Sequence, residues 1–298
     1  TFNLLVVESA ENKKAKIIFK KKLPVKLGSG GFADKIITPE AFQRGLDALK
    51  IHKSSIETLE VTSIHAFATS ALRNASNSLE FLKTVVQETG IEVSIISGEK
   101  EAELIYAGVS RALDIGLKPQ LIMDIGGGST EFIIADNKQL FWKHSFDLGV
   151  SRILEKVTTS DPLSDSDISA LENYFDIELE LLFAAIEKFP IDGLIGSSGS
   201  FESLAELILV SYKSKKSLIN NTFYSFRLED LQVIHAKLIG STRKERENMK
   251  GLVNYRIDTI PLAAAFVMYI IKRFMIKEIR LSTYALREGV MSELINMA

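Results

Sequence analysis

Apolar residues recur along this chain with two different periods, and segments of the two kinds alternate. Helical spacing appears in segments such as 38–49, 78–90 and 164–188, whereas short continuous apolar runs such as 121–123 and 191–195 are typical of buried strands. Glycines, prolines and capping residues separate these segments. Strands that alternate with helices predict an α/β fold, and each half of the chain offers β-hairpins followed by such an alternation.

Four segments carry more detailed predictions. Thr38 is expected to cap a helix whose first residue is Pro39. A near-heptad apolar stripe predicts one long helix over residues 164–188. Residues 59–69 predict a core strand, and the Gly-Ser-Gly-Gly sequence of residues 28–31 predicts a turn after basic strands.

The most informative stretch is LIMDIGGGSTEFIIAD, residues 121–136, which predicts a strand, a glycine turn and a second strand. Gly126, Gly127 and Gly128 lack Cβ atoms, so successive backbone N–H groups can converge on an anion such as a phosphate. Asp124 and Glu131 stand at the two mouths of this turn. Because bare carboxylates repel phosphate oxygens, we expect them to hold a hard cation such as Mg²⁺.

Other glycine-rich phosphate loops fit this stretch less well. A Walker loop needs a lysine directly after its last glycine, and none follows here. A dinucleotide-binding fingerprint needs a helix after the glycines, whereas residues 130–135 are rich in strand formers. A hairpin of purely structural use would not need three glycines between two acids. A strand–loop–strand phosphate site is left.

A second glycine-rich turn follows the apolar run 191–195. Its sequence, GSSGS at residues 196–200, precedes a helical pattern over 201–210. The free N–H groups and the dipole of a helix start favour anions, so Gly199 and Ser200 are candidate phosphate ligands. Two such loops in one half of the chain predict a phosphate cradle with two parts.

Charged residues near predicted strand ends add further candidates. Arg73 follows a strand-to-helix turn, close to the sheet edge where α/β proteins bind ligands, and a guanidinium fork suits phosphate. Glu99, Glu101 and Glu103 open the helix that leads to the central hairpin. Acids in a first helical turn are also favoured by the helix dipole alone, so the residue types by themselves leave both interpretations open.

Length and composition narrow the class of protein. A chain of 298 residues is long for one core and comfortable for two. The linker DIGLKP at 114–119 predicts a boundary between domains 1–116 and 117–298. The net charge of -2 argues against general attraction to DNA or membranes, so a polyanionic ligand must be met by local groups.

Other features bear on the compartment. The absence of cysteine excludes disulfides and thiolate metal sites. The most apolar stretch, 260–271, is about half of the ~20 residues that a membrane-spanning helix needs. No signal segment opens the chain, and a cytoplasmic protein is expected. The first residues already form an apolar strand, which suggests that something preceded them.

Five motifs, in this order, resemble the exopolyphosphatase / guanosine pentaphosphate phosphohydrolase family of the actin-like ATPase superfamily. They are ISGEKEAELIYAGV (96–109), MDIGGGSTEF (123–132), LGV (148–150), GSSGS (196–200) and STYALREGV (282–290). The first two are the specific ones, and the likeness covers essentially the whole chain. It implies an α/β fold of two ribonuclease-H-like domains flanking an interdomain cleft. It also implies the short form without a C-terminal helical domain, with the last helix packing back on the first domain.

The resemblance assigns roles residue by residue. The catalytic glutamate falls on Glu101 and the phosphate-contacting arginine on Arg73. The magnesium-site pair falls on Asp124 and Glu131, and whether Glu101 or Glu131 is the base stays open. The phosphate loop falls on Gly126, Gly127, Gly128 and Ser129. The family's earlier phosphate loop is entered here only at Thr1-Phe2, for which we expect truncation or disorder rather than loss.

The implied activity is hydrolysis of a phosphoric anhydride. Water would attack the terminal phosphoryl group of inorganic polyphosphate or of guanosine pentaphosphate, with Mg²⁺ neutralising charge. Two alternatives from other classes stay open: a kinase of the same superfamily that uses ATP, and a non-catalytic regulator that binds guanosine penta- or tetraphosphate or polyphosphate. A homodimer is also left open.

Overall fold

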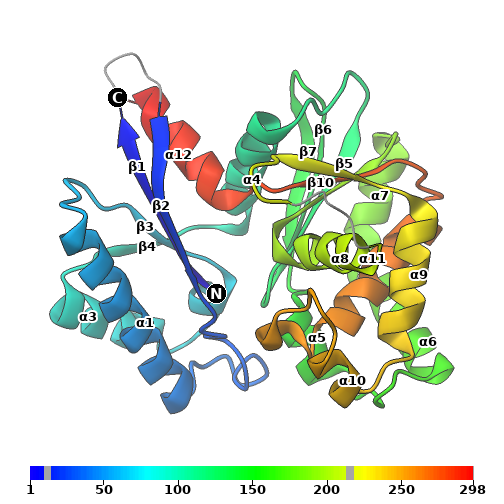
Figure 1. Cartoon of the computed structure of the whole chain (residues 1–298), viewed down its shortest axis with the longest axis horizontal. Helices are drawn as coiled ribbons and strands as arrows, with labels where there is room; N and C mark the ends of the chain where they lie inside the picture. Colours follow the sequence, from blue (N-terminus) through cyan, green and yellow to red (C-terminus); the bar gives the residue numbers. More distant parts are fainter. Residues whose placement is uncertain (10–14, 213–217, 298) are drawn as a thin grey trace.

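The computed structural model describes residues 1–9, 15–212 and 218–297, which form two lobes on either side of a cleft (Figure 1). Its strands are β1 (Phe2–Ser9), β2 (Ala15–Leu23), β3 (Ala66–Ala68), β4 (Val93–Ile95), β5 (Gln120–Ile125), β6 (Thr130–Ala135), β7 (Leu140–Phe146), β8 (Leu194–Ser197), β9 (Phe223–Phe226) and β10 (Ile279–Ser282). Its helices are α1 (Pro39–Thr58), α2 (Ser70–Arg73), α3 (Ser78–Thr89), α4 (Gly98–Ala112), α5 (Val150–Lys156), α6 (Asp165–Glu178), α7 (Glu180–Lys188), α8 (Ser198–Ser211), α9 (Leu228–Ile239), α10 (Arg243–Glu247), the 3₁₀ helix η1 (Asn254–Arg256), α11 (Ile260–Arg273) and α12 (Leu286–Met297).

The larger lobe is built on one mixed sheet. In the described residues its six strands follow the order β7-β6-β5-β8-β10-β9. β8 runs parallel to both β5 and β10, while β6, β7 and β9 join as antiparallel neighbours. Both faces of the central strands are covered, by α4 on one side and by α8 and α11 on the other. This double cover explains why every residue of β5 and β6 is buried and why residues 121–123 and 132–134 are apolar without alternation.

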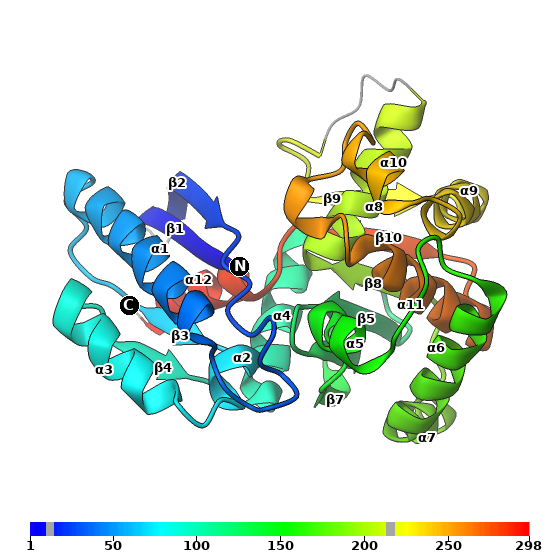
Figure 2. The same cartoon turned by 90° about the horizontal axis from the view of Figure 1, so that it is seen from below.

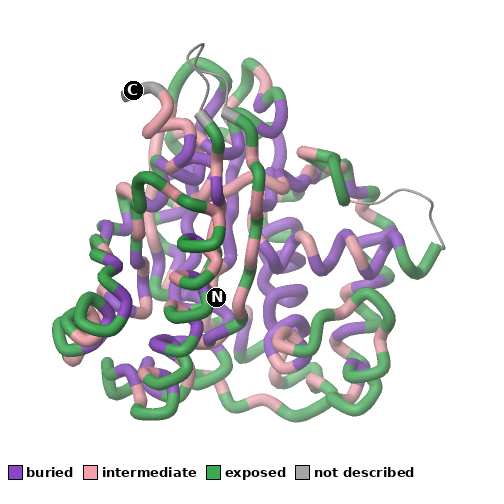
Figure 3. Tube along the Cα trace, turned by 60° about the vertical axis from the view of Figure 1, so that its left-hand side comes forward, coloured by how far each residue is buried: buried purple, intermediate pink, exposed green. Residues whose placement is uncertain are grey.

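The smaller lobe contains two short pieces of sheet. β1 and β2 form an antiparallel hairpin, and β3 pairs in parallel with β4. The helices α1 and α3 pack together over them, with the rings of Phe42 and Phe81 in edge-to-face contact at 4.9 Å. Figure 3 shows that buried residues run through the interior of both lobes and that exposed residues follow the outer helices.

The last helix, α12, packs against both β1 and α4. α12 lies beside β1 in Figure 1 and packs along α4. The helices approach closely at two glycines, because a Cβ on Gly289 would lie 1.8 Å from the carbonyl oxygen of Leu104, and one on Gly108 would lie 2.1 Å from that of Ala285. The expected domain boundary at residues 116 and 117 stays a prediction. α4, which precedes it, packs on the sheet of the larger lobe.

Most predicted elements are present, and two predictions are wrong. The Thr38 hydroxyl accepts a hydrogen bond from the Ala41 amide at the start of α1, as its capping role requires. The helix predicted over 164–188 is interrupted at Leu179, which separates α6 from α7. The apolar stripe continues across this break, so spacing alone does not reveal it. The strand predicted over 59–69 is reduced to the three residues of β3.

Two further features were not predicted. β9, with the sequence FYSF, forms one edge of the large sheet, and its four residues are too few for a clear strand pattern. α8 begins at Ser198, three residues earlier than the helical pattern indicates. Among the described residues, no helix combines the length and the apolar character needed to cross a membrane.

Candidate active site

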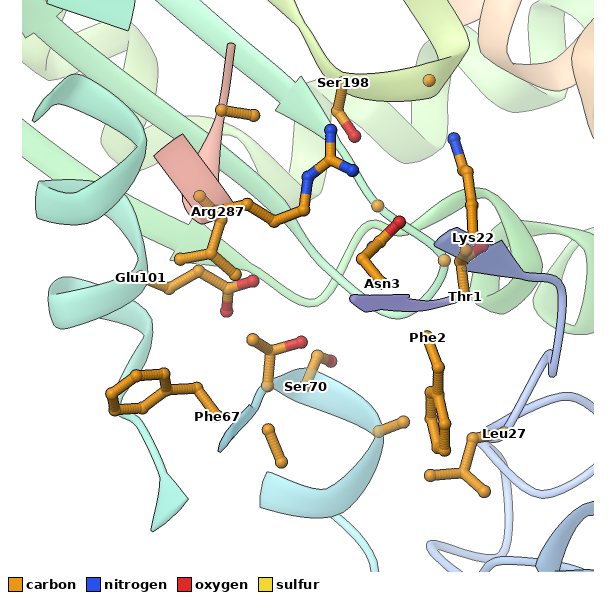
Figure 4. A pocket seen from close by; sticks show the side chains of 18 of the residues that line it. Thr1, Phe2, Asn3, Lys22, Leu27, Phe67, Ser70, Glu101, Ser198 and Arg287 are labelled. Carbon is orange, nitrogen blue, oxygen red and sulfur yellow. The ribbon is translucent and has the colours of Figure 1, made fainter. Parts of the chain in front are cut away.

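A cavity of about 1030 Å³ opens between the two lobes and continues into the smaller lobe beside β1 and β3 (Figure 4). It is lined by the β5–β6 turn, the first turns of α4 and α8, and residues of α2, η1 and α12. The predicted site residues that line it are Glu101, Asp124, Gly126, Gly127, Gly128, Ser129, Glu131, Gly199 and Ser200. Segments far apart in the sequence therefore meet at one cleft.

The pleat of the large sheet explains why the carboxylates converge. Asp124 and Glu131 are directly paired across β5 and β6, so their side chains leave the same face of the sheet. Ile122 and Ile133, each two positions from an acid and paired with each other, lie on this same face and pack beneath α4 together with Ile195 of β8. Glu101 stands in the first turn of α4. It therefore overhangs the end of the sheet where the two other acids emerge.

Glu101 is buried at the wall of the cleft with 7% of its surface exposed. Its Oε2 accepts a hydrogen bond from Nη1 of Arg73 at 3.1 Å, and the Thr69 hydroxyl is a second partner. Burial raises the pKa of Glu101 from 4.5 to about 7; Arg73 counteracts this rise, and the nearby charge of Asp124 adds to it. A carboxyl group with a pKa near neutrality is suited to general-base chemistry.

The other two acids are held by hydroxyl groups. Ser129 Oγ and Ser145 Oγ both donate to Oε1 of Glu131 at 2.7 Å, and Ser197 Oγ donates to Oδ2 of Asp124 at 2.5 Å. Burial raises the pKa of Asp124 to about 6. Burial, followed by the charges of the neighbouring acids, raises the pKa of Glu131 well above its usual value. Three acids therefore converge at the site, and the Arg73 guanidinium group pairs with one of them, Glu101.

This donor set fits a hard divalent cation. Mg²⁺ is commonly bound by one or two carboxylates, with waters and substrate phosphates as its other ligands. Asp124 and Glu131 offer such a pair at the cleft. Within residues 1–9, 15–212 and 218–297, no group of three or more His, Cys, Asp or Glu side chains forms a complete protein cage. The two carboxylates therefore suit magnesium, and the expected role of Asp124 and Glu131 as metal ligands stays a prediction.

The carbonyl groups of the glycine loop are directed at α5. The carbonyl oxygens of Gly126, Gly127 and Gly128 accept hydrogen bonds from the amides of Val150 and Ser151 and from Nε of Arg152, at 3.0, 2.9 and 3.0 Å respectively. All three carbonyl oxygens thus face the first turn of α5 or the side chain of Arg152. In a trans peptide the N–H points opposite to the C=O, so the next amides along the chain point away from α5. The loop lines the cavity, and an anion-binding nest formed by its amides stays a prediction.

The second predicted phosphate loop is the start of α8. Ser198 has a φ of +67°, a backbone conformation that is uncommon for a residue with a side chain and that turns the chain from β8 into α8. The guanidinium group of Arg256 lies directly against Gly199, where an added Cβ would come 1.5 Å from its Nη2. A larger residue there would have to displace the Arg256 side chain. A helix start and a guanidinium group face the cleft together, which favours an anion.

Arg73 is the predicted residue that does not line the cleft. Its Nη1 donates to the carbonyl oxygen of Ile96 and to Glu101, and its Nη2 donates to Ser145 Oγ at 3.3 Å. Ser145 in turn contacts Glu131. Arg73 therefore lies behind the acids and links two of them, and a phosphate contact by its guanidinium group stays a prediction.

Three residues at the cleft were not among the predicted site residues. Ser70 is buried, its hydroxyl has no partner among the described residues, and it lies 2.7 Å from where a Cβ of Gly128 would be. Figure 4 shows Ser70 and Glu101 close to each other at the cavity wall. Ser70 lies in the same strand-to-helix turn as Arg73, so its position in the sequence could have indicated that it belongs to the site. Lys22 and Arg256 line the cleft from β2 and η1, and no local motif marks them.

Comparisons with known proteins identify the family of this chain. Residues 5–297 match the sequence model of the Ppx/GppA phosphatase family. A crystal structure of an exopolyphosphatase from Cytophaga hutchinsonii is 34% identical, with a TM-score of 0.96 over 99% of this chain and 95% of that one. An Aquifex aeolicus member of the Ppx/GppA family is 22% identical, with a TM-score of 0.79 over 99% of this chain and 94% of that one. An exopolyphosphatase-like protein is 23% identical, with a TM-score of 0.86 over 98% and 93%.

The structures that are 22% and 23% identical support the fold alone. The family match is stronger evidence because it spans nearly the whole sequence. The expected α/β fold of two ribonuclease-H-like domains flanking a cleft is confirmed by this match and by the Cytophaga structure. The chain therefore belongs to the Ppx/GppA phosphatase family.

Proposed function

We propose that this protein is a phosphohydrolase that releases terminal orthophosphate from inorganic polyphosphate, from guanosine pentaphosphate, or from both. The observation that carries the proposal is the convergence, at one cleft, of Glu101, Asp124 and Glu131 with the glycine loop. Family membership and the 34% identical exopolyphosphatase from Cytophaga hutchinsonii support the same class of reaction.

Glu101 is the proposed general base. It orients a water molecule in line with the bridging oxygen of the terminal anhydride and takes its proton as the new O–P bond forms. The bridging P–O bond breaks, and the shortened chain leaves as the anion. Arg73 holds the Glu101 carboxylate from behind, because its guanidinium group is occupied by Glu101, Ser145 and the Ile96 carbonyl. We therefore propose an orienting role for Arg73.

The terminal phosphate is proposed to bind between the two glycine-rich loops. The amides of the 126–129 loop meet it on one side, and the first turn of α8 with Gly199 and Ser200 meets it on the other. The buried hydroxyl of Ser70 and the guanidinium group of Arg256 stand at the same cavity and can complete its hydrogen bonds. These groups are neutral donors or cations, as a polyphosphate needs.

Asp124 and Glu131 are the proposed ligands of Mg²⁺ or another divalent cation. When bound there, such an ion supplies charge neutralisation for the phosphate oxygens. Both carboxylates must be ionised to hold such an ion, and their raised pKa values make its binding depend on pH. The hydroxyl groups of Ser129, Ser145 and Ser197 keep the two side chains oriented.

The test is a phosphate-release assay with polyphosphate and guanosine pentaphosphate side by side, in the presence of Mg²⁺. Glu101→Gln is expected to abolish turnover and to keep measurable substrate binding. Glu103→Gln is the matched control, because Glu103 is on the same helix but pairs with Lys143 outside the cleft. Transfer of phosphate from ATP to an acceptor would point to a kinase. Tight binding without release by the parent protein would point to a regulator.

A further inference from the structure

We infer that Glu155 and Arg152, two residues of α5, are positioning residues that clasp loop 28–32 of the smaller lobe to the glycine loop of the larger lobe. The inference rests on the proposed function, since it concerns how the 126–129 loop is held for phosphate. Neither residue lines the cleft, so each acts through the loop it contacts.

The larger-lobe half of the clasp is α5 itself. Its first amides occupy carbonyl groups of the glycine loop, and Arg152 Nε occupies the last of them, that of Gly128. Gly149, which caps α5, touches the loop directly, because an added Cβ would lie 2.3 Å from the backbone of Gly127 and Gly128. The loop and α5 therefore move as one body. The direction of the loop's N–H groups depends on where α5 is held.

The smaller-lobe half of the clasp is loop 28–32. The Glu155 carboxylate accepts two hydrogen bonds from its backbone, from the Gly30 amide to Oε1 at 2.6 Å and from the Phe32 amide to Oε2 at 3.1 Å. The guanidinium group of Arg152 lies over the Phe32 ring at 4.7 Å. The same ring fills the space against Gly128, where an added Cβ would come within 2.8 Å of it.

Further hydrogen bonds anchor loop 28–32 in the smaller lobe and add a second bridge between the lobes. Behind loop 28–32, the Ile37 amide donates to Asn77 Oδ1 at 2.8 Å, and Asn77 Nδ2 donates back to the Ile37 carbonyl at 2.9 Å. A second bridge runs through Asp147, whose Oδ1 accepts from Nη2 of Arg152 and from Nδ2 of Asn74, a residue of the smaller lobe. Figure 2 shows the segment between β2 and α1 reaching toward α5. The clasp thus links the lobes beside the proposed phosphate loop.

This arrangement accounts for the glycine-rich sequence of residues 28–31. Gly28 leaves room for the Phe32 ring, since an added Cβ would lie 2.4 Å from it, and Gly30 has a φ of +76°. The amides that such a turn exposes are already used by Glu155. The turn therefore serves the clasp and is not a third phosphate loop.

The first experiment compares backbone hydrogen exchange in the parent protein, Glu155→Ala and Lys156→Ala. Glu155 is exposed, so its loss leaves the core intact, and Lys156 is its neighbour on α5 without contact to loop 28–32. We expect faster exchange of the amides in 28–32 and 126–129 in Glu155→Ala only. Unchanged exchange in both segments would overturn the inference, whether or not the protein hydrolyses phosphate.

The second experiment measures phosphate release. Removing two hydrogen bonds to a carboxylate is expected to lower kcat/KM about tenfold in Glu155→Ala, mainly through KM. The pH profile is expected to stay that of the parent, because Glu101 is untouched. Arg152→Lys keeps the charge and loses the Nε–H, so a similar loss is expected. Parent-like kcat/KM in both variants would contradict the positioning role. Absence of activity in the parent would count against the proposed function, and the exchange measurement would then decide on the clasp.

Discussion

Replacing Glu101 by glutamine is expected to slow phosphate release and, at alkaline pH, to stabilise the folded protein. The carboxyl group is buried, and desolvation raises its pKa from 4.5 to about 7 despite the contact with Arg73. Glutamine has the same shape and keeps a carbonyl acceptor for Arg73, but it has no proton to lose. Activity and stability should therefore change in opposite directions.

The size of the stability change follows from linkage. A folded-state pKa above the unfolded value means that the folded protein binds this proton more tightly than the unfolded chain does. Its contribution to stability is fully present below about pH 4.5 and is lost as the pH rises through about 7. A pKa raised from 4.5 to about 7 corresponds to about 3 kcal/mol. Glu101→Gln should thus exceed the unfolding free energy of the parent by up to this amount at pH 8, and by less than about 1 kcal/mol at pH 5, which is just above the unfolded-state pKa.

The assay combines denaturant unfolding at pH 5 and pH 8, without divalent cations, with phosphate release in the presence of Mg²⁺. Loss of a general base is expected to lower kcat by roughly 10²–10⁴-fold. Glu103→Gln, whose site lies outside the cleft, should change neither quantity appreciably.

Two results would refute this reasoning. Parent-like turnover of Glu101→Gln would remove Glu101 as the base and leave Glu131 as the candidate. A variant that is inactive and also less stable than the parent at pH 5 would show that the side chain is needed for folding, so its inactivity would say nothing about base catalysis.

Three other predictions concern the cation, the loop and the last helix. EDTA should stop phosphate release, and Mg²⁺ should restore it. Mg²⁺ should also raise the melting temperature more at pH 8 than at pH 5. The reason is that the carboxylates of Asp124 and Glu131 must ionise to bind the ion, and burial raises their pKa values. Gly128→Ala should weaken orthovanadate binding measured by calorimetry, since its Cβ would lie 2.7 Å from the Ser70 hydroxyl and must displace the loop. Gly289→Ala should lower the unfolding free energy measured by urea titration by about 1–3 kcal/mol, because its Cβ would lie 1.8 Å from the Leu104 carbonyl oxygen. Gly240→Ala is the control and should be nearly neutral, because the nearest atom to its Cβ lies at 3.4 Å.

The sequence by itself determined the elements whose signals lie within a few residues. The Thr38 cap and the hairpin around Gly126–Gly128 were predictable because caps and glycine turns are satisfied by neighbours along the chain. The motif order was also enough to indicate the family. The break at Leu179 was not predictable, since a buried apolar stripe looks the same in one helix or in two.

Only the tertiary structure decided which polar groups face the cleft. Glu101 was distinguished from Glu99 and Glu103 by resemblance, and the packing of α4 on the sheet is what points it toward Asp124 and Glu131. The same packing places Arg73 behind the acids, although its residue type and position suggested a phosphate contact. Orientation of this kind depends on contacts between segments distant in the sequence, which leave no local pattern, and so side-chain roles at the cleft could be assigned only once the two lobes were assembled.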